Sequence, residues 1–206
     1  MSKSCYGEAV TKPYHHGDLR RELIRHALTE ITEHGVAALK LRELARRAGV
    51  SHAAPAHHFG DKAGLLTAIA TEGFTLLADT LESARERGFL ETGVAYVSFA
   101  VEHPAHFAVM FGPYGDDSDP HLAAARDRAG AILDEGVADL PHPPKESDRH
   151  DAAIGAWSLV HGFSTLWLNG ALSLPADADP TVLARRIVNA LLAPERNAPT
   201  RRRQKA

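Results

Sequence analysis

Cysteine is nearly missing from this sequence, which has Cys5 as its single thiol among 206 residues. One thiol excludes a disulfide bond within the chain and fits a protein kept in a reducing compartment. Residues 1–13 also lack the apolar core of a secretory signal peptide. These two absences lead us to expect a cytoplasmic protein.

Uninterrupted hydrophobic runs are missing as well. Residues 152–176 contain no Asp, Glu, Lys or Arg, and this stretch is long enough to span a bilayer. The same stretch holds three glycines and six Ser, Thr, Asn or His residues, so it is only moderately apolar. A charge-free helix rich in small residues is instead typical of a helix buried on most of its sides in a soluble protein. We therefore expect no membrane partner.

The patterns of β-strands and of common catalytic sites are also missing. No alternating β-branched run bounded by turns is present, so the chain is expected to be all-α. Thirteen histidines would suit an enzyme, but the sequence contains no HExxH, no phosphate-cradling glycine loop and no Ser/His/Asp order. We expect neither an enzyme nor a bound cofactor.

What the sequence does contain is a stretch at residues 41–59, LRELARRAGVSHAAPAHHF, with the pattern of two short helices and a tight turn. Gly49 follows the first helix, where a chain often exits in the left-handed conformation that glycine adopts cheaply. Ser51 is expected to cap a second helix over residues 52–59, with Pro55 near its start. The apolar stripe of the first helix consists of Leu41, Leu44, Ala45 and Ala48.

This pattern is typical of a helix-turn-helix, whose second helix enters the major groove of DNA. A corner between two helices of an ordinary bundle would look similar, and the charge distribution helps to separate the two. Residues 12–62 hold nine Lys and Arg against six Asp and Glu, whereas residues 63–195 hold eight against nineteen. A basic segment ahead of an acidic one favours a polyanionic partner for the basic segment.

These residues resemble the DNA-binding domain of the TetR family of transcriptional regulators. The resemblance covers Tyr14 to about Leu81 and includes a helix ending in EHG at residues 33–35, then LRELARRAGVS, then HHF, then DK and LL. A shorter segment, AWSLVHGFSTLW at residues 156–167, resembles the Trp–His–Gly signature of the C-terminal domain in one subgroup of the family.

The resemblance implies an all-α protein with an N-terminal three-helix DNA-binding domain and a C-terminal helical domain for ligand binding and dimerisation. We expect a disordered N-terminus at 1–13, the helix-turn-helix domain at 14–62, the effector-binding and dimerisation domain at 63–194, and a basic disordered tail at 195–206. Helices are expected near residues 17–34, 62–85, 89–102, 104–112, 120–138, 148–173 and 178–193.

The function implied is that of a one-component transcriptional regulator, expected to act as a repressor. A homodimer would bind a palindromic DNA operator and leave it when a small apolar effector binds. By resemblance, Arg42 and Lys62 would hold phosphates, and the start of the second helix would point N–H groups at the backbone. The other candidate DNA-binding residues are Ser51, His52, Ala53, Ala56, His57 and His58.

Two positions depart from the family pattern. The family commonly has a DNA-contacting tyrosine where this chain has Ala56, and a Ser or Thr cap where it has Lys40. We expect weaker or differently specified DNA binding, with more of the affinity left to salt-sensitive phosphate contacts. A helical dimer whose degenerate head no longer binds DNA specifically is the alternative.

Residues 103–115, HPAHFAVMFGPYG, are the second stretch with a functional character. Aromatic and soft side chains with one or two polar groups favour the lining of an effector pocket. Plain core packing is the alternative for Phe107 and Met110. A metal site on His103 and His106 is a further alternative, but the spacing fixes no third ligand, so no metal is expected. The candidate pocket residues are Phe99, His103, Phe107, Met110, Phe111, Trp157 and His161.

The last two long helices have a separate expected role. In proteins of the TetR family these helices pair with those of a second subunit, so the resemblance implies that residues 148–173 and 178–193 form the dimer interface. Glycines in the first of these helices would let a second helix approach closely. The candidate interface residues are Gly155, Gly162, Trp167, Leu183, Ile187 and Leu191.

Overall fold

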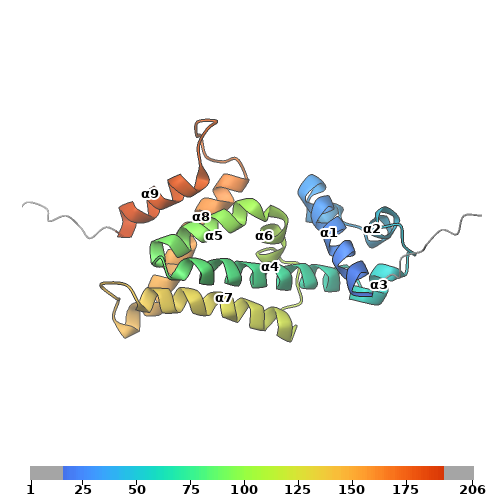
Figure 1. Cartoon of the computed structure of the whole chain (residues 1–206), viewed down its shortest axis with the longest axis horizontal. Helices are drawn as coiled ribbons and strands as arrows, with labels where there is room; N and C mark the ends of the chain where they lie inside the picture. The colour runs from blue at the N-terminus through green and yellow to red at the C-terminus, as the bar shows by residue number, and fades with distance from the viewer. Residues whose placement is uncertain (1–15, 193–206) are drawn as a thin grey trace, which may run out of the picture. The chain divides into compact units, whose positions relative to one another are not determined.

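The computed structural model describes residues 16–192, and every regular element in that range is an α-helix or a 3-10 helix (Figure 1). The expected all-α fold is confirmed. The chain divides into two compact units, with a boundary after Leu65 that falls inside α4 (Lys62–Arg85). The predictions for Cys5, for the N-terminal arm and for the basic tail lie outside the described residues.

The first unit is built on α1 (His16–His34), which packs against α2 (Leu41–Arg47). A 3-10 turn, Val36–Ala38, joins them, and α3 (Ala54–Phe59) follows α2. Gly35 ends α1 with a φ of 79°, in the left-handed region that glycine reaches without strain. The small core of this unit consists of Leu23, Ile24, Ala27, Ile31, Leu39, Leu44 and Ala45.

The prediction that Ser51 caps the second helix of the motif is wrong. That helix, α3, begins at Ala54, has Ala53 as its N-cap, and receives no side-chain cap. The reason is that Pro55 has no N–H, whereas a helix beginning at residue 52 would need this N–H to reach the Ser51 carbonyl. The Ala54 N–H donates to that carbonyl instead, at 3.0 Å, and the helix starts directly before the proline.

The second unit surrounds α5, which packs against α6, α8 and α9, while α7 packs against α8. Figure 1 shows α7 running beside α4, and ion pairs join these two helices, with Arg85 2.6 Å from Glu135 and Arg128 2.7 Å from Asp79. In chain order the elements after α4 are α5 (Phe89–Glu102), α6 (Pro104–Met110), α7 (Pro120–Ala138), a 3-10 turn (Glu146–Asp148), α8 (Arg149–Leu168) and α9 (Pro180–Leu192).

Helix α8 ends at Leu168, before the point that the sequence indicated. The φ of Gly170 is 64°, its N–H donates to the Trp167 carbonyl, and the Ala171 N–H donates to the Leu166 carbonyl, both at 3.0 Å. This pair of bonds is a Schellman motif, which ends a helix at a glycine in the left-handed conformation. Glycine therefore stops α8 within the charge-free stretch.

Most of the hydrophobic core lies in the second unit. Phe99, Val97 and Ala100 of α5 are almost fully buried, as are Leu66, Ile69 and Leu77 of α4. Among the described residues, no helix is both long enough and apolar enough to cross a bilayer.

Phe99 provides a test of this core, because its side chain on α5 is 1% exposed. Phe99→Ala removes most of a buried aromatic side chain and leaves a cavity, so it should lower the free energy of unfolding by about 3–5 kcal/mol. Glu82→Ala, at a side chain that is 53% exposed, should change that free energy by less than about 0.5 kcal/mol. Chemical denaturation of both variants measures the difference, and equal effects would contradict the assigned core.

Candidate DNA-binding surface and ligand cavity

The turn between α2 and α3 is fixed by backbone hydrogen bonds. Gly49 has a φ of 66°, its N–H donates to the Arg46 carbonyl at 3.2 Å, and the Val50 N–H donates to the Ala45 carbonyl at 3.0 Å. These bonds form a second Schellman motif, as the glycine in the sequence indicated. Ala45 is 0% exposed, so its small side chain is enclosed where α2 meets the rest of the unit.

Helix α3 turns one side inward and leaves the other side exposed. Pro55 is buried, and Phe59 is half-buried with the Arg20 guanidinium 5.3 Å from its ring centre. His58 is also half-buried. The residues exposed on α3 and on the turn before it are Ser51, His52, Ala53, Ala56 and His57. Among these, His52, Ala53, Ala56 and His57 are the candidates for contacts with DNA bases, and two of the four are alanines.

The two residues expected to hold phosphates have different surroundings. Arg42 is exposed in the first turn of α2, and within residues 16–192 it forms no ion pair. Lys62, in the first turn of α4, is half-buried, and its Nζ donates to the carbonyls of Val36 at 2.9 Å and Ala37 at 3.3 Å. Lys62 therefore ties the start of α4 to the turn after α1. Lys40 is the N-cap of α2 and makes no side-chain cap, because an ammonium group has no acceptor for the free N–H groups of the helix.

The other two arginines of α2 already face carboxylates. Arg46 lies 2.5 Å from Glu43, and Arg47 lies 2.8 Å from Glu30. Hydrogen bonds from Arg46 and, secondarily, from Arg47 lower the pKa of Glu43 to about 2, so this carboxylate is ionised at neutral pH. The charges of Arg46 and Arg47 are thus largely matched within the unit, and Arg42 is the arginine of α2 that forms no ion pair within residues 16–192.

Nothing in the sequence indicated a metal in the first unit. Among the described residues, the one group of three ligand-type side chains close enough to share an ion is Glu30, Glu33 and His34. The Arg47 guanidinium pairs with both carboxylates, so a cationic side chain already supplies the positive charge there. His106, considered as a metal ligand from the sequence, instead places Nε2 3.2 Å from a Glu72 carboxylate oxygen.

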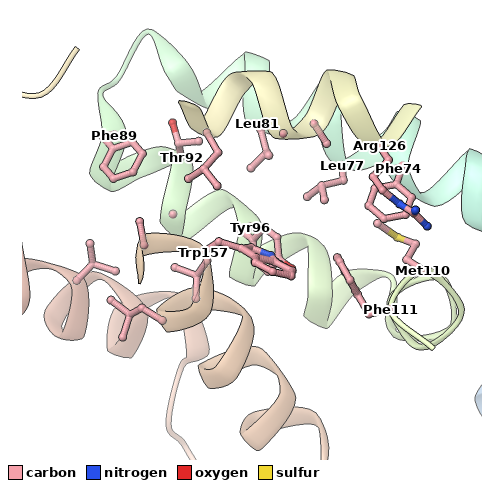
Figure 2. A pocket seen from close by; sticks show the side chains of 18 of the residues that line it. Phe74, Leu77, Leu81, Phe89, Thr92, Tyr96, Met110, Phe111, Arg126 and Trp157 are labelled. Atoms are coloured by element: carbon pink, nitrogen blue, oxygen red, sulfur yellow. The ribbon is translucent and has the colours of Figure 1, made fainter. Parts of the chain in front are cut away.

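A cavity of about 530 Å³ lies inside the second unit, a size suited to a small-molecule ligand. Its walls are mainly apolar and come from α4, α5, α7, α8 and α9, and from the end of α6 and the segment after it. Figure 2 shows Phe89 and Thr92 at one end, Met110 and Arg126 at the other, and Tyr96 and Trp157 between them. The cavity is therefore elongated, with its polar groups at separate points along it.

Three of the seven residues expected in the pocket line this cavity: Met110, Phe111 and Trp157. Phe99, Phe107, His103 and His161 do not line it. His161 lies directly behind the wall, with its ring centre 4.6 Å from that of Phe111. Sequence reasoning missed Phe74, Tyr96 and Arg126. Helical spacing alone provided no means of separating Phe74 from ordinary core, whereas Arg126 could have been flagged as a charge among the alanines of α7.

A chain of hydrogen bonds links the cavity wall to His161. The Trp157 indole Nε1–H donates to the Tyr96 hydroxyl oxygen at 3.2 Å, and that hydroxyl lies 2.9 Å from Nδ1 of His161. Burial lowers the pKa of His161 and raises the pKa of Tyr96, so both groups are neutral near pH 7. Since indole can only donate, the Tyr96 oxygen accepts from Trp157, and the Tyr96 hydroxyl and His161 Nδ1 form the second hydrogen bond of the chain.

Apolar side chains remain exposed on α8 and α9. Leu166 of α8 is 47% exposed and Val182 of α9 is 54% exposed, and Ile154 is similar. Of the residues expected at the dimer interface, Gly155 is exposed, and Gly162, Trp167, Leu183 and Ile187 are half-buried. The side chain of Leu191 lies outside the described residues. A group of large apolar side chains on two neighbouring helices is typical of a protein interface.

Two sequence families match this chain. The family described as "Bacterial regulatory proteins, tetR family" matches residues 23–69, which contain α2 and α3. The family described as "Tetracyclin repressor-like, C-terminal domain" matches residues 89–191, which begin with α5 and end in α9. Both units of the structure are therefore represented in these matches.

Individual relatives agree with the family matches. The HTH-type transcriptional regulator BetI 2 of Chromohalobacter salexigens is 30% identical over 166 residues, covering 75% of this chain and 78% of that protein. A solved protein of unknown function from Rhodococcus sp. RHA1 is 33% identical and has a TM-score of 0.72, covering 87% of this chain and 96% of that one. The TetR family regulator PfmR of Thermus thermophilus shares the fold, with 24% identity, a TM-score of 0.61, and coverage of 82% and 96%.

The half-buried position of His161 gives a prediction for stability against pH. Because burial lowers the pKa of His161 below its ordinary 6.5, the unfolded chain takes up this proton first on acidification. The stabilisation due to neutral His161 is therefore complete above pH 6.5 and declines as the pH falls below it. Thermal unfolding should show that the wild type has a higher melting temperature than His161→Gln at pH 7.5 and that this difference decreases toward pH 5. A difference in melting temperature that stays constant over this pH range would contradict the lowered pKa of His161.

Proposed function

This chain belongs to the TetR family of transcriptional regulators, and we propose that it is a repressor that binds a palindromic operator as a homodimer and leaves it when a small, largely apolar effector binds. The family consists of DNA-binding regulators, which are generally not enzymes. The observation that carries the proposal is the accessible side of α3, which has Pro55 packed inward and His57 exposed.

Base reading is assigned to the residues on that accessible side. The imidazoles of His52 and His57 can donate to or accept from base edges in the major groove. Ala53 and Ala56 offer methyl groups, which contact the methyl group of thymine but form no hydrogen bond. This surface therefore reads few bases by hydrogen bonds, and A·T pairs fit its alanines better than G·C pairs do.

Phosphate contacts carry a large share of the proposed affinity. Arg42 is exposed without an ion-pair partner among residues 16–192, so its guanidinium can bind a phosphate without breaking a bond. Lys62 gives two of its three N–H donors to the carbonyls of Val36 and Ala37, and the third can still reach a phosphate. Such contacts fix the register on DNA without reading sequence, and they weaken as salt rises.

A helical dimer with a degenerate head is the second candidate function, because half of the proposed base-reading residues are alanines. The same fold would then keep its cavity and its dimer while binding DNA without sequence preference. A salt-dependent but sequence-independent affinity would identify this case.

The dimer proposal rests on the exposed apolar side chains of α8 and α9. Ile154, Leu166 and Val182 would be removed from water by a second copy of the same surface, which is the driving force for such interfaces. Gly155 and Gly162 support close approach, because a Cβ at either position would meet no atom within 4 Å. Two α3 helices would then meet DNA about 34–36 Å apart, or at a multiple of that spacing.

The effector proposal rests on the cavity. The effector must bind the conformer that cannot hold DNA more tightly than the conformer that can, since equal affinity shifts nothing. α4 contains both Lys62 and the cavity residues Phe74, Leu77 and Leu81. A displacement of α4 caused by the effector is the proposed route by which cavity occupancy alters operator affinity.

An electrophoretic shift with DNA flanking the chain's own coding region tests the DNA-binding proposal. Arg42→Ala should weaken binding to all sequences about equally and reduce the salt slope by about one, whereas His57→Ala should change base preference. Arg87→Ala, which removes the same charge from the second unit, is the matched control and should leave binding unchanged. No shift with the wild type, or the same loss in Arg42→Ala and Arg87→Ala, would refute the proposal.

The dimer proposal is tested by introducing a charge among the exposed apolar side chains of α8 and α9. Val182→Glu would bury a carboxylate in the proposed interface, so we expect the protein to sediment as a monomer at concentrations where the wild type is a dimer. Ala124→Glu, at an exposed position on α7, is the control and should remain dimeric. A Val182→Glu variant that is as dimeric as the control would place the interface elsewhere.

A further inference from the structure

One end of the ligand cavity differs chemically from the rest. A smaller cavity of about 230 Å³ adjoins it, and the two share Met110, Gly112, Asp117 and Arg126 as lining residues. Among the described residues that line either cavity, Arg126 is the one cation and Asp117 the one anion. The remaining polar groups of the large cavity, Thr92, Tyr96 and Trp157, are neutral. An ion pair therefore marks one end of an otherwise apolar cavity.

The two members of this ion pair are held very differently. Arg126 projects from α7, and its guanidinium lies 5.4 Å from the centre of the Phe74 ring, a cation–π distance. Figure 2 shows Arg126, Phe74 and Met110 together at the end of the cavity opposite Phe89. Asp117 lies in the segment between α6 and α7, where its side chain is 82% exposed and one oxygen is 3.1 Å from Arg126 Nη2. The Phe74 ring thus orients a guanidinium whose side chain is 45% exposed, while water surrounds most of the anion.

We infer that the ligand of this cavity is an amphipathic anion: a carboxylate bound by Arg126, followed by an apolar chain that passes Tyr96 and Trp157 toward Phe89. The inference rests on the part of the proposed function that gives the cavity a small-molecule ligand, and it names the chemical class of that ligand. No covalent bond is made or broken. The ligand carboxylate replaces the Asp117 carboxylate as the ion-pair partner of Arg126.

This exchange costs little because Asp117 is already largely hydrated. An exposed ion pair adds little stability, and the released side chain returns to water. The ligand carboxylate gains a planar guanidinium whose two parallel N–H groups match its two oxygens. On its cavity side Arg126 borders apolar walls, so the apolar chain of the same ligand leaves water while its carboxylate pairs with the guanidinium.

Ligands of other charge fit this end less well. An ammonium group would have to pair with Asp117, and it would then lie beside the Arg126 guanidinium, a like charge that packing keeps in place. A neutral alcohol of the same chain length would leave the Arg126–Asp117 pair intact and gain only from burial of its apolar chain. The carboxylate is the head group that gains from both the cavity and its charged end.

Ligand titrations of the full-length protein test this inference without DNA. Fluorescence of the protein's tryptophans, one of which is Trp157 in the cavity wall, reports binding of decanoate, decanol and decyltrimethylammonium at neutral pH. Decanoate should bind about tenfold or more tighter than decanol, the order expected for one charge-assisted contact. Decyltrimethylammonium should bind more weakly than either.

Substitutions on α7 then separate the contact from general effects on folding. Arg126→Gln should reduce decanoate affinity to that of decanol while leaving decanol unchanged, and Arg126→Lys should restore part of the difference. Arg128→Gln is the matched control: it is the same change on the same helix, its partner is Asp79, and it does not line either cavity. Asp117→Asn should tighten decanoate binding, because it removes the competing carboxylate.

Three results with the wild type would overturn the inference: equal affinities of decanoate and decanol, tighter binding of the ammonium ligand, or no binding of any of the three. An equal effect of Arg126→Gln and Arg128→Gln would do so as well. Failure of the repressor proposal is recognised separately. If the protein binds decanoate through Arg126 but shifts no operator DNA, the anion site is supported and the repressor proposal is contradicted.

Discussion

A missing N–H group at Pro55 determines where α3 begins, and the proposed DNA-binding surface depends on that starting point. A helix begun at residue 52 would leave the Ser51 carbonyl without its helical donor, so the chain makes a tighter turn in which the Ala54 N–H supplies the bond. The left-handed Gly49 fixes the other side of the turn. With both ends set by backbone bonds, a six-residue helix holds Pro55 inward and His57 outward, although such a helix is too short to be stable by itself.

The helices of the second unit pack so that an apolar cavity of about 530 Å³ remains between them. Helices α4, α5, α7 and α8 supply the walls, and exposed ion pairs such as Arg85–Glu135 link α4 to α7 across the outside. The polar groups on the walls are already satisfied: Trp157 donates to Tyr96, and Tyr96 bonds to His161. A ligand is therefore oriented mainly by shape and by the charged end at Arg126, which supports an elongated molecule with one polar head.

The sequence predicted the parts of this molecule that depend on local chemistry. Helical spacing, the Gly49 exit and the positive charge of residues 12–62 led to the helix-turn-helix, and a family match covers residues 23–69. The cap at Ser51 was wrong, because the absent donor of Pro55 outweighs the capping preference of serine. The cavity was predicted only in part, since Tyr96 and Arg126 come to line the same cavity through the packing of helices far apart in sequence, and hydrophobic periodicity does not show such packing. His161 was expected to line the pocket, but it lies behind the ring of Phe111 and forms a hydrogen bond with Tyr96.

The central claim is that two copies of α3, related by a twofold axis, occupy neighbouring major grooves on one side of an operator. Hydroxyl-radical footprinting of the full-length protein on its operator measures this most directly. We expect two protected segments of near-palindromic sequence, centred about 34–36 Å apart or at a multiple of that spacing, on one face of the duplex. A single protected segment, or protection spread evenly along the DNA without regard to sequence, would contradict the account.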